Sequence, residues 1–330
     1  MFIVPDPQAK AIYQKRVFQL LGSACLLSLF TGLMLSPARV ACMLTTGQYT
    51  VNVGSTCVDN TASFSLVSRS SQIATLIVHD GGALTFTGAD VEIGVISGAR
   101  HSVPIGYPTG AGSLIVDSNL KNKAVNGTNQ CALYVTGSGS SATIPGNFIA
   151  IRNGGSGGAA LQITAGTSLY VGGNTHLNSN VTNPLRSGGV NNFQGKVVAT
   201  ATAATAVVTT MIDSETEIIG ELRVNAPHST GIGHQMNGGY LTAKQISTVS
   251  AGGNAIDSTR GTISLGGLSQ GVVAGKTVVS IGPQASFSLA NAKGVMVGGT
   301  QDQTISLSGN IRRASSALLG NTVTGQKSDV

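Results

Sequence analysis

Apolar and polar residues alternate in short segments along most of this chain, and residues 157–177 show the pattern most clearly. The two alternating segments in this stretch are bounded by Gly or Asn, with no helical period between them. Because successive side chains of a strand point to opposite faces, the stretch predicts two strands with one apolar and one polar face each. We expect four of the side chains in the core (Leu161, Ile163, Leu169 and Val171) and four outside it (Gln162, Thr164, Ser168 and Tyr170).

Weaker copies of this unit recur from residue 47 onward. Equivalent apolar positions in the later copies lie 18 to 24 residues apart, and the expected pairs are Ile232 and Ile256, Leu241 and Ile263, Ile263 and Phe287, and Phe287 and Ile305. Periods of this size are typical of solenoids. A single unit is too small to bury its apolar face, whereas stacked units cover one another.

The repeat therefore predicts an all-β chain folded as a right-handed parallel β-helix behind an N-terminal signal helix. Gly and Asn between the strands are expected to supply the left-handed backbone that sharp corners need. Sandwiches and barrels are the alternative, since they also consist of short alternating strands. The likeness of the units to one another favours the solenoid.

Three stretches interrupt this rhythm. Residues 182–194 contain Asn-Pro and Asn-Asn pairs and predict a loop or an irregular coil, and residues 103–112 similarly predict a projecting loop. Residues 197–210 form a low-complexity Ala/Thr run whose β-branched content favours strand, either as one long strand or as a slack rung.

Composition narrows the class of protein. The 330 residues include 45 Gly, no Trp and 41% hydrophobic residues, which favours a folded β chain over disorder. The formal net charge is +6, but residues 1–41 contribute four basic residues against Asp6, a net +3, so about +3 is spread over the remainder. A nucleic-acid binder usually carries a clustered basic face, so we expect no nucleic-acid partner.

The N-terminal segment has the order of a secretory signal peptide. Lys10, Lys15 and Arg16 precede the apolar run 17–35, and small residues follow it. We predict a signal peptide over residues 1–41, cut near 38–42, then a β-helix domain over 42–325 and a tail over 326–330. The apolar run is long enough for a membrane anchor, but its small residues and Gln19 favour cleavage, and we expect no stable membrane span afterwards.

The cysteines decide whether the exported protein can form a disulfide. Export to an oxidising compartment permits a disulfide, and Cys42 with Cys57 would close a short loop at the N-terminal end. Cleavage after Cys42 would remove that disulfide, and lipidation of Cys42 is a further alternative with a poor lead-in sequence. Cys131 lies in an alternating apolar segment, where a buried small hydrophobic side chain is expected.

Side chains suited to catalysis are sparse. The densest acidic stretch holds Asp213, Glu215 and Glu217, with Glu221 nearby, and alternation would place the first three on one face. Such a set could bind Ca²⁺ or act on a glycosidic bond, but a solvated outer face is the simpler interpretation. His234 follows a Gly without the companion motifs of pectin hydrolases. We therefore expect no catalytic residue, no metal site and no cofactor.

Gly-rich units such as residues 253–265, behind an extended basic N-terminal segment, resemble the passenger domains of type V autotransporters, in particular the pertactin-like passengers of Gram-negative bacteria. The resemblance covers most of residues 47–310 and implies a pectin-lyase-like β-helix, export across the inner membrane and a place in the periplasm, at the cell surface or outside the cell. It also implies contact with host or neighbouring-cell surface molecules. The family's C-terminal β-barrel is missing, so we expect either a truncated or split gene or a stand-alone secreted solenoid.

These expectations leave three hypotheses on function. The first is a secreted or surface-exposed, non-enzymatic passenger-like protein acting in adhesion and associated with virulence. The second is a β-helix enzyme, a polysaccharide lyase or hydrolase. The third is an inactive fragment of a split gene. The outer face, with Tyr134, Tyr170 and Tyr240 among Ser, Thr, Asn and Gln, suits extended contact better than catalysis.

Overall fold

The computed structural model describes most of the compact unit Val40–Val330, namely residues 43–45, 48–68, 76–88, 90–95, 101–107, 110–125, 131–202, 209–226, 232–251, 253–272, 279–289, 296–298, 304–307, 310–312 and 322–324. The predicted signal peptide, the tail 326–330 and Cys42 lie outside these residues. Within them, the regular secondary structure consists of strands, β1 to β28, with no helix.

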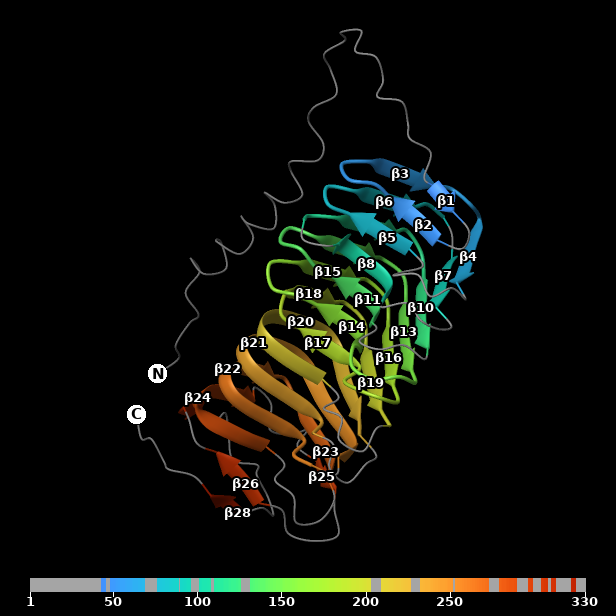
Figure 1. Cartoon of the computed structure of the whole chain (residues 1–330). Helices are drawn as coiled ribbons and strands as arrows, with labels where there is room; N and C mark the ends of the chain where they lie inside the picture. The colour runs from blue at the N-terminus through green and yellow to red at the C-terminus, as the bar shows by residue number, and fades with distance from the viewer. Residues whose placement is uncertain are drawn as a thin grey trace. The chain divides into compact units, whose positions relative to one another are not determined.

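The strands stack in parallel to form a β-helix with three faces, which we call the first, second and third sheets (Figure 1). The first sheet begins with β2 (Gln48–Val51), β5 (Leu76–His79), β8 (His101–Tyr107), β11 (Cys131–Val135), β14 (Ala159–Ile163) and β17 (Leu185–Ser187). The second begins with β3 (Thr56–Asp59), β6 (Ala83–Phe86), β9 (Ser113–Val116), β12 (Ser141–Ile144), β15 (Ser168–Val171) and β18 (Val190–Phe193). The third begins with β4 (Ser63–Ser68), β7 (Asp90–Val95), β10 (Leu120–Val125), β13 (Phe148–Asn153), β16 (Thr175–Ser179) and β19 (Val197–Ala201).

Later strands run through more than one sheet. β20 (Thr209–Asn225) pairs with β17, β18 and β19 in turn, and β21 (His234–Ala251) pairs along it. The stack then continues through β22 (Ile256–Leu265), β23 (Leu268–Val272), β24 (Val279–Leu289), β25 (Met296–Gly298), β26 (Thr304–Leu307), β27 (Asn310–Arg312) and β28 (Thr322–Thr324). At the other end, β1 (Met43–Thr45) pairs with β2 in the antiparallel direction and covers the first strand of the first sheet.

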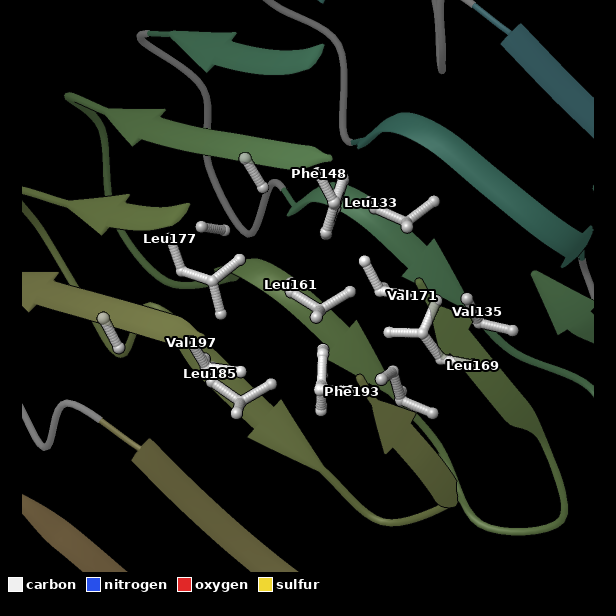
Figure 2. Packing of buried hydrophobic residues seen from close by; sticks show 14 of the residues in the cluster. Leu133, Val135, Phe148, Leu161, Leu169, Val171, Leu177, Leu185, Phe193 and Val197 are labelled. Atoms are coloured by element: carbon white, nitrogen blue, oxygen red, sulfur yellow. The ribbon is translucent and has the colours of Figure 1, made fainter. Parts of the chain in front are cut away.

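The core consists of inward-facing apolar side chains that stack on like residues of the next coil. Leu133, Leu161 and Leu185 are register partners in successive coils and are all fully buried (Figure 2). Burial of each such side chain stabilises the folded state by about 1.5–3 kcal/mol relative to an exposed side chain. The four inward positions predicted in residues 157–177 are buried, and Ser168 and Tyr170 are exposed, so the predicted alternation is confirmed.

The stretch expected to be a loop or an irregular coil, 182–194, and the expected loop 103–112 both contain strands of the β-helix. In 182–194, β17 and β18 pair with β14 and β15, because Leu185 and Phe193 continue the inward rows of Leu161 and Val171. In 103–112, β8 pairs with β11 and its Val103 and Ile105 are buried. The turn-forming residues near them misled the prediction. The Ala/Thr run 197–210 supplies β19 and the start of β20, and residues 203–208 lie outside the described part.

The repeat spacings are partly as predicted. Leu241 pairs with Ile263, and Ile263 pairs with Phe287, which confirms two of the four expected pairs. Ile256, however, pairs with His234 rather than with Ile232. Phe287 pairs with Ile311, which corrects the expected pairing with Ile305. Apolar spacing alone does not show where in a coil a residue lies: Ile232 precedes β21 at a corner, and Ile305 lies in β26 of the first sheet, whereas Phe287 lies in the second.

The corners use glycine in two different ways. Gly157, Gly158 and Gly166 have positive φ angles of 64°, 79° and 76°, as the prediction for corners requires. Gly173 does not have a positive φ angle, but a Cβ atom there would lie 2.7 Å from the carbonyl oxygen of Gly146. At this second kind of corner, glycine is needed because the coils approach too closely for any side chain.

Asparagine side chains link the coils at the corner between the second and third sheets. The backbone N–H of Asn147 donates to Oδ1 of Asn119 (2.7 Å), and that of Asn174 donates to Oδ1 of Asn147 (2.9 Å). The N–H of Lys196 continues the series by donating to Oδ1 of Asn174 (3.0 Å). These asparagines therefore satisfy corner backbone donors and do not supply the left-handed backbone that was predicted for them.

Candidate functional site

The outer face of the second sheet brings together residues that are far apart in the chain. Its side chains form two parallel rows, which follow from the strand register: Ser168, Val190, Glu215, Tyr240 and Thr262 in one row, and Tyr170, Asn192, Glu217, Thr242 and Ser264 in the other. They come from β15, β18, β20, β21 and β22, whose labels follow one another in Figure 1. We call Tyr170, Asn192, Glu215, Glu217 and Tyr240 the tyrosine–carboxylate patch.

The tyrosines of the patch are presented to solvent. Tyr240 is 61% exposed and Tyr170 is 40% exposed, and Val190 between their coils is 50% exposed. Exposed large side chains on a strand face are normally isolated, whereas Tyr170 and Val190 lie on the adjacent strands β15 and β18, and Tyr240 follows two strands later on β21. Leu169 and Leu241, which alternate with them along the strands, are buried and fix the two tyrosine backbones in place.

Amide side chains position one carboxylate of the patch. Asn192 donates through Nδ2 to Oε2 of Glu217, 3.0 Å away. Gln194 in turn donates through Nε2 to Oδ1 of Asn192. This short series of hydrogen bonds crosses from β18 to β20 and holds Glu217 beside Glu215 on the outer face.

Beneath the patch, the core is locally polar. Asn191 is buried and donates through Nδ2 to Oγ1 of Thr216 (3.1 Å) and to the carbonyl oxygen of Gly189 (3.1 Å). Ser214 Oγ lies 3.4 Å from Thr216 Oγ1, and both residues are buried. The strand that carries the two carboxylates is therefore held from its inner side by hydrogen bonds as well as by packing.

Asp213, the third acidic residue of the predicted cluster, lies at the turn before this face. It has a φ of 49°, which is unusual for a residue other than glycine, and it is exposed. Its Oδ2 accepts a hydrogen bond from Nη2 of Arg260, 3.0 Å away. Arg260 lies two coils later in the chain, so no local sequence pattern indicates that it pairs with Asp213.

Glu221 lies apart from the patch, at the next corner. Its Oε2 is 2.6 Å from Nζ of Lys196. Burial acts to raise the pKa of Glu221, but the hydrogen bond and the charge of Lys196 outweigh it, and the pKa is lowered. Among the described residues, no three His, Cys, Asp or Glu side chains lie close enough to hold a metal ion.

His234 is a core residue. It is fully buried in β21, with Nδ1 2.7 Å from Oγ1 of Thr209 in the preceding coil. Burial lowers its pKa to about 4, so the ring is neutral at physiological pH. The ring lies beneath the surface and stacks in register between Thr209 and Ile256.

The cysteines divide as follows. Cys57 is disulfide-bonded and buried, and its pairing with Cys42 stays a prediction because Cys42 lies outside the described residues. Cys131 is a buried thiol outside any disulfide, its burial is as predicted, and burial raises its pKa to about 12. Its Sγ lies 3.3 Å from Oε1 of Gln162.

The three tyrosines singled out from the sequence separate into two groups. Tyr134 lies in β11 on the first sheet, is half-buried, and is the register partner of Pro104 and Gln162. Tyr170 and Tyr240 lie on the second sheet. The alternation indicates which tyrosines point outward, but only the register indicates which two share a face.

The fold and this face define the chain as a parallel β-helix protein. Comparison with protein-family models, with curated proteins and with solved structures found no match. The resemblance to autotransporter passengers thus depends on the repeat pattern and on the β-helix itself. In the described part of the chain, no helix has the length and apolar character needed to cross a membrane.

Proposed function

We propose that the protein is an exported, non-enzymatic β-helical protein that acts by adhesion, contacting surface molecules of host or neighbouring cells through the outer face of the second sheet. The observation that carries the proposal is the tyrosine–carboxylate patch. Its two exposed tyrosines and two carboxylates come from β15, β20 and β21 and share one regular face.

A face of this kind is suited to binding. Tyrosine combines a large apolar surface with a polar tip and few rotatable bonds, and it is enriched at protein interfaces for this reason. The strands of the patch are hydrogen-bonded to neighbours on both sides, so their side chains stand at fixed spacings before a partner arrives. A preorganised surface loses less entropy on binding.

The surroundings of the acidic residues also favour binding over catalysis. Asp213 is paired with Arg260, Glu221 with Lys196, and Glu217 accepts a hydrogen bond from Asn192. Each of these contacts fixes a strand or a corner. Glu215 and Glu217 stand side by side on one strand, whereas a glycosidase needs its two carboxylates on opposite sides of the scissile bond.

Export follows from the predicted signal peptide and from the passenger-like repeats. We propose that residues 1–41 direct the chain across the inner membrane of a Gram-negative cell, to the periplasm, the surface or the medium, and that virulence association follows from adhesion. The third hypothesis, an inactive fragment of a split gene, predicts export without adhesion.

The proposal is tested by expressing the full chain in a Gram-negative host and fractionating the cells. We expect a shortened protein in the periplasmic, surface or extracellular fraction, and we expect this purified protein to bind to cell surfaces. A full-length cytoplasmic product, or an exported product that binds no cells, contradicts the proposal. New reducing ends or unsaturated products from polygalacturonate or another polysaccharide would instead favour the enzyme hypothesis.

A further inference from the structure

We infer that the tyrosine–carboxylate patch binds an extended chain of amino sugars, that is, a glycan with free primary amines. The inference rests on the proposed adhesive function and names the class of ligand for the same face. It is argued from the charge of the face, from the spacing of its rows and from the absence of a free strand edge within it.

Two neighbouring carboxylates on β20 give the outer face of the second sheet a local negative charge. The two outward rows run from Thr56 to Asn310 and from Val58 to Arg312. The charged residues of these rows are Glu215, Glu217 and Arg312, and Arg312 lies on β27, four strands from Glu217 along β20, β21, β22, β24 and β27. Arg260 and Lys196, at the two edges of this stretch, are each engaged by a carboxylate, at 3.0 Å and 2.6 Å. The patch therefore presents two adjacent negative charges, and the cation of its own rows, Arg312, lies about 19 Å from Glu217 along the helix axis at the usual strand separation.

The negative charge of Glu215 and Glu217 favours a positively charged ligand. Primary ammonium groups form charge-assisted hydrogen bonds with carboxylates, which are stronger than hydrogen bonds between neutral groups. Uronic-acid polymers and nucleic acids would be repelled by Glu215 and Glu217. A neutral glycan would be accepted only through hydroxyl contacts with Asn192 and Thr242 and through the tyrosines.

The spacing favours a chain of repeated units. Tyr170 is three strands from Tyr240, along β15, β18, β20 and β21, so the two rings stand about 14 Å apart along the helix axis at the usual strand separation. One coil advances by a distance close to the length of one sugar ring in an extended glycan. Such a chain can stack on Tyr170, pass over Asn192 of β18, place one ring between Glu217 and Glu215 at the level of β20, and stack on Tyr240.

A basic peptide fits the face less well. Peptides bind to sheets mainly by adding a strand at a free edge, or they bind in an apolar groove. The strands of the patch have no free edge, because β18 is paired with β15 and β20, and β20 is paired with β18 and β21. What remains is a face of side chains, where tyrosine rings can stack on the apolar faces of sugars.

The test uses the purified exported protein and chitosan-type oligomers of six glucosamine units, with titration calorimetry at low and at moderate salt. We expect binding that weakens with salt, and binding at least tenfold weaker for the N-acetylated hexamer and for the galacturonate hexamer. Glu215→Gln and Glu217→Gln should each reduce affinity about tenfold, the effect of one lost charge-assisted hydrogen bond. Tyr170→Ala should reduce it about fivefold.

Glu92→Gln is the matched control, because Glu92 lies in β7 of the third sheet and is paired with Lys121. It should leave the affinity unchanged, and unchanged thermal unfolding should show that every variant is folded. The inference is overturned by equal binding of the acetylated hexamer, by equal losses in Glu92→Gln and Glu217→Gln, or by a lysine hexapeptide that binds as tightly as the glucosamine hexamer. If no hexamer binds but the protein still binds cells, only the ligand class is wrong. If it binds neither, the proposed function fails as well.

Discussion

Arg260 donates through Nη2 to Oδ2 of Asp213, 3.0 Å away, although 47 positions separate the two residues in the sequence. The bond joins β22 to the turn of β20 across the intervening coil. Both side chains are about half exposed, at 47% and 62%. A surface ion pair of this kind contributes little to stability, typically less than about 1 kcal/mol.

Arg260→Ala should therefore lower the free energy of unfolding by less than about 1 kcal/mol. The loss should shrink further in high salt, because exposed charges are screened. Urea denaturation at low and at high salt measures both effects. A loss that is large and independent of salt would mean that Arg260 acts through packing instead.

The asparagine series at the corner between the second and third sheets should contribute more to the free energy of unfolding than its exposed position indicates. Asn147→Ala removes the acceptor for the N–H of Asn174, and it should cost about 1 kcal/mol, whereas Asn147→Asp keeps an acceptor oxygen and should cost less. Asn178→Ala, at an exposed position of β16, serves as the control and should change stability by less than about 0.5 kcal/mol. Equal effects at Asn147 and Asn178 in urea denaturation would contradict a role for the corner series.

The close approach of successive coils at the glycine corners can be tested by adding one methyl group. A Cβ at Gly195 would lie 2.4 Å from the carbonyl oxygen of Gly173, so Gly195→Ala should force two coils apart and destabilise the protein by about 1–3 kcal/mol. Gly267→Ala is the control, since its nearest neighbour would be 3.8 Å away. Thermal unfolding should distinguish them, and an unchanged midpoint for Gly195→Ala would show that the coils are not so closely spaced.

Burial of His234 should make the free energy of unfolding depend on pH. Its pKa is about 4 in the folded protein, against 6.5 ordinarily, so the unfolded chain binds the proton more readily between these values. The stability associated with neutral His234 is full above about pH 6.5 and falls as the pH decreases towards 4.

His234→Gln removes this titration. The difference in unfolding free energy between the wild type and the variant should therefore narrow from pH 7.5 to pH 4.5, measured by urea denaturation at each pH. Carboxylates elsewhere titrate in both proteins and cancel in the comparison. A difference that stays constant over this range would place the pKa of His234 near its ordinary value.

The alternation of side chains was sufficient to predict the fold. Leu161, Ile163, Leu169 and Val171 are buried as expected, because burial on a strand depends on a local period of two. For residues 182–194 the alternative of a loop was wrong, because Asn and Pro at corners resemble a loop, although Leu185 and Phe193 keep the inward rows intact.

The candidate site could be predicted only in part. The sequence indicates that Glu215, Glu217, Tyr170 and Tyr240 point outward, but it does not show that they share a face. That relationship depends on coil lengths, which vary from 18 residues between Thr304 and Thr322 to 30 between Val103 and Leu133 among the described residues. Asp213 and Arg260 meet for the same reason, and no local pattern connects them.

The central claim is that the outer face of the second sheet makes the adhesive contact. The most direct measurement compares cell-surface binding by the purified wild type, the double variant Tyr170→Ala/Tyr240→Ala and the control His176→Ala, whose side chain is exposed on the third sheet. The account predicts that the double variant, with unchanged thermal unfolding, loses most of the binding and that His176→Ala keeps it. Equal binding by all three proteins would contradict it.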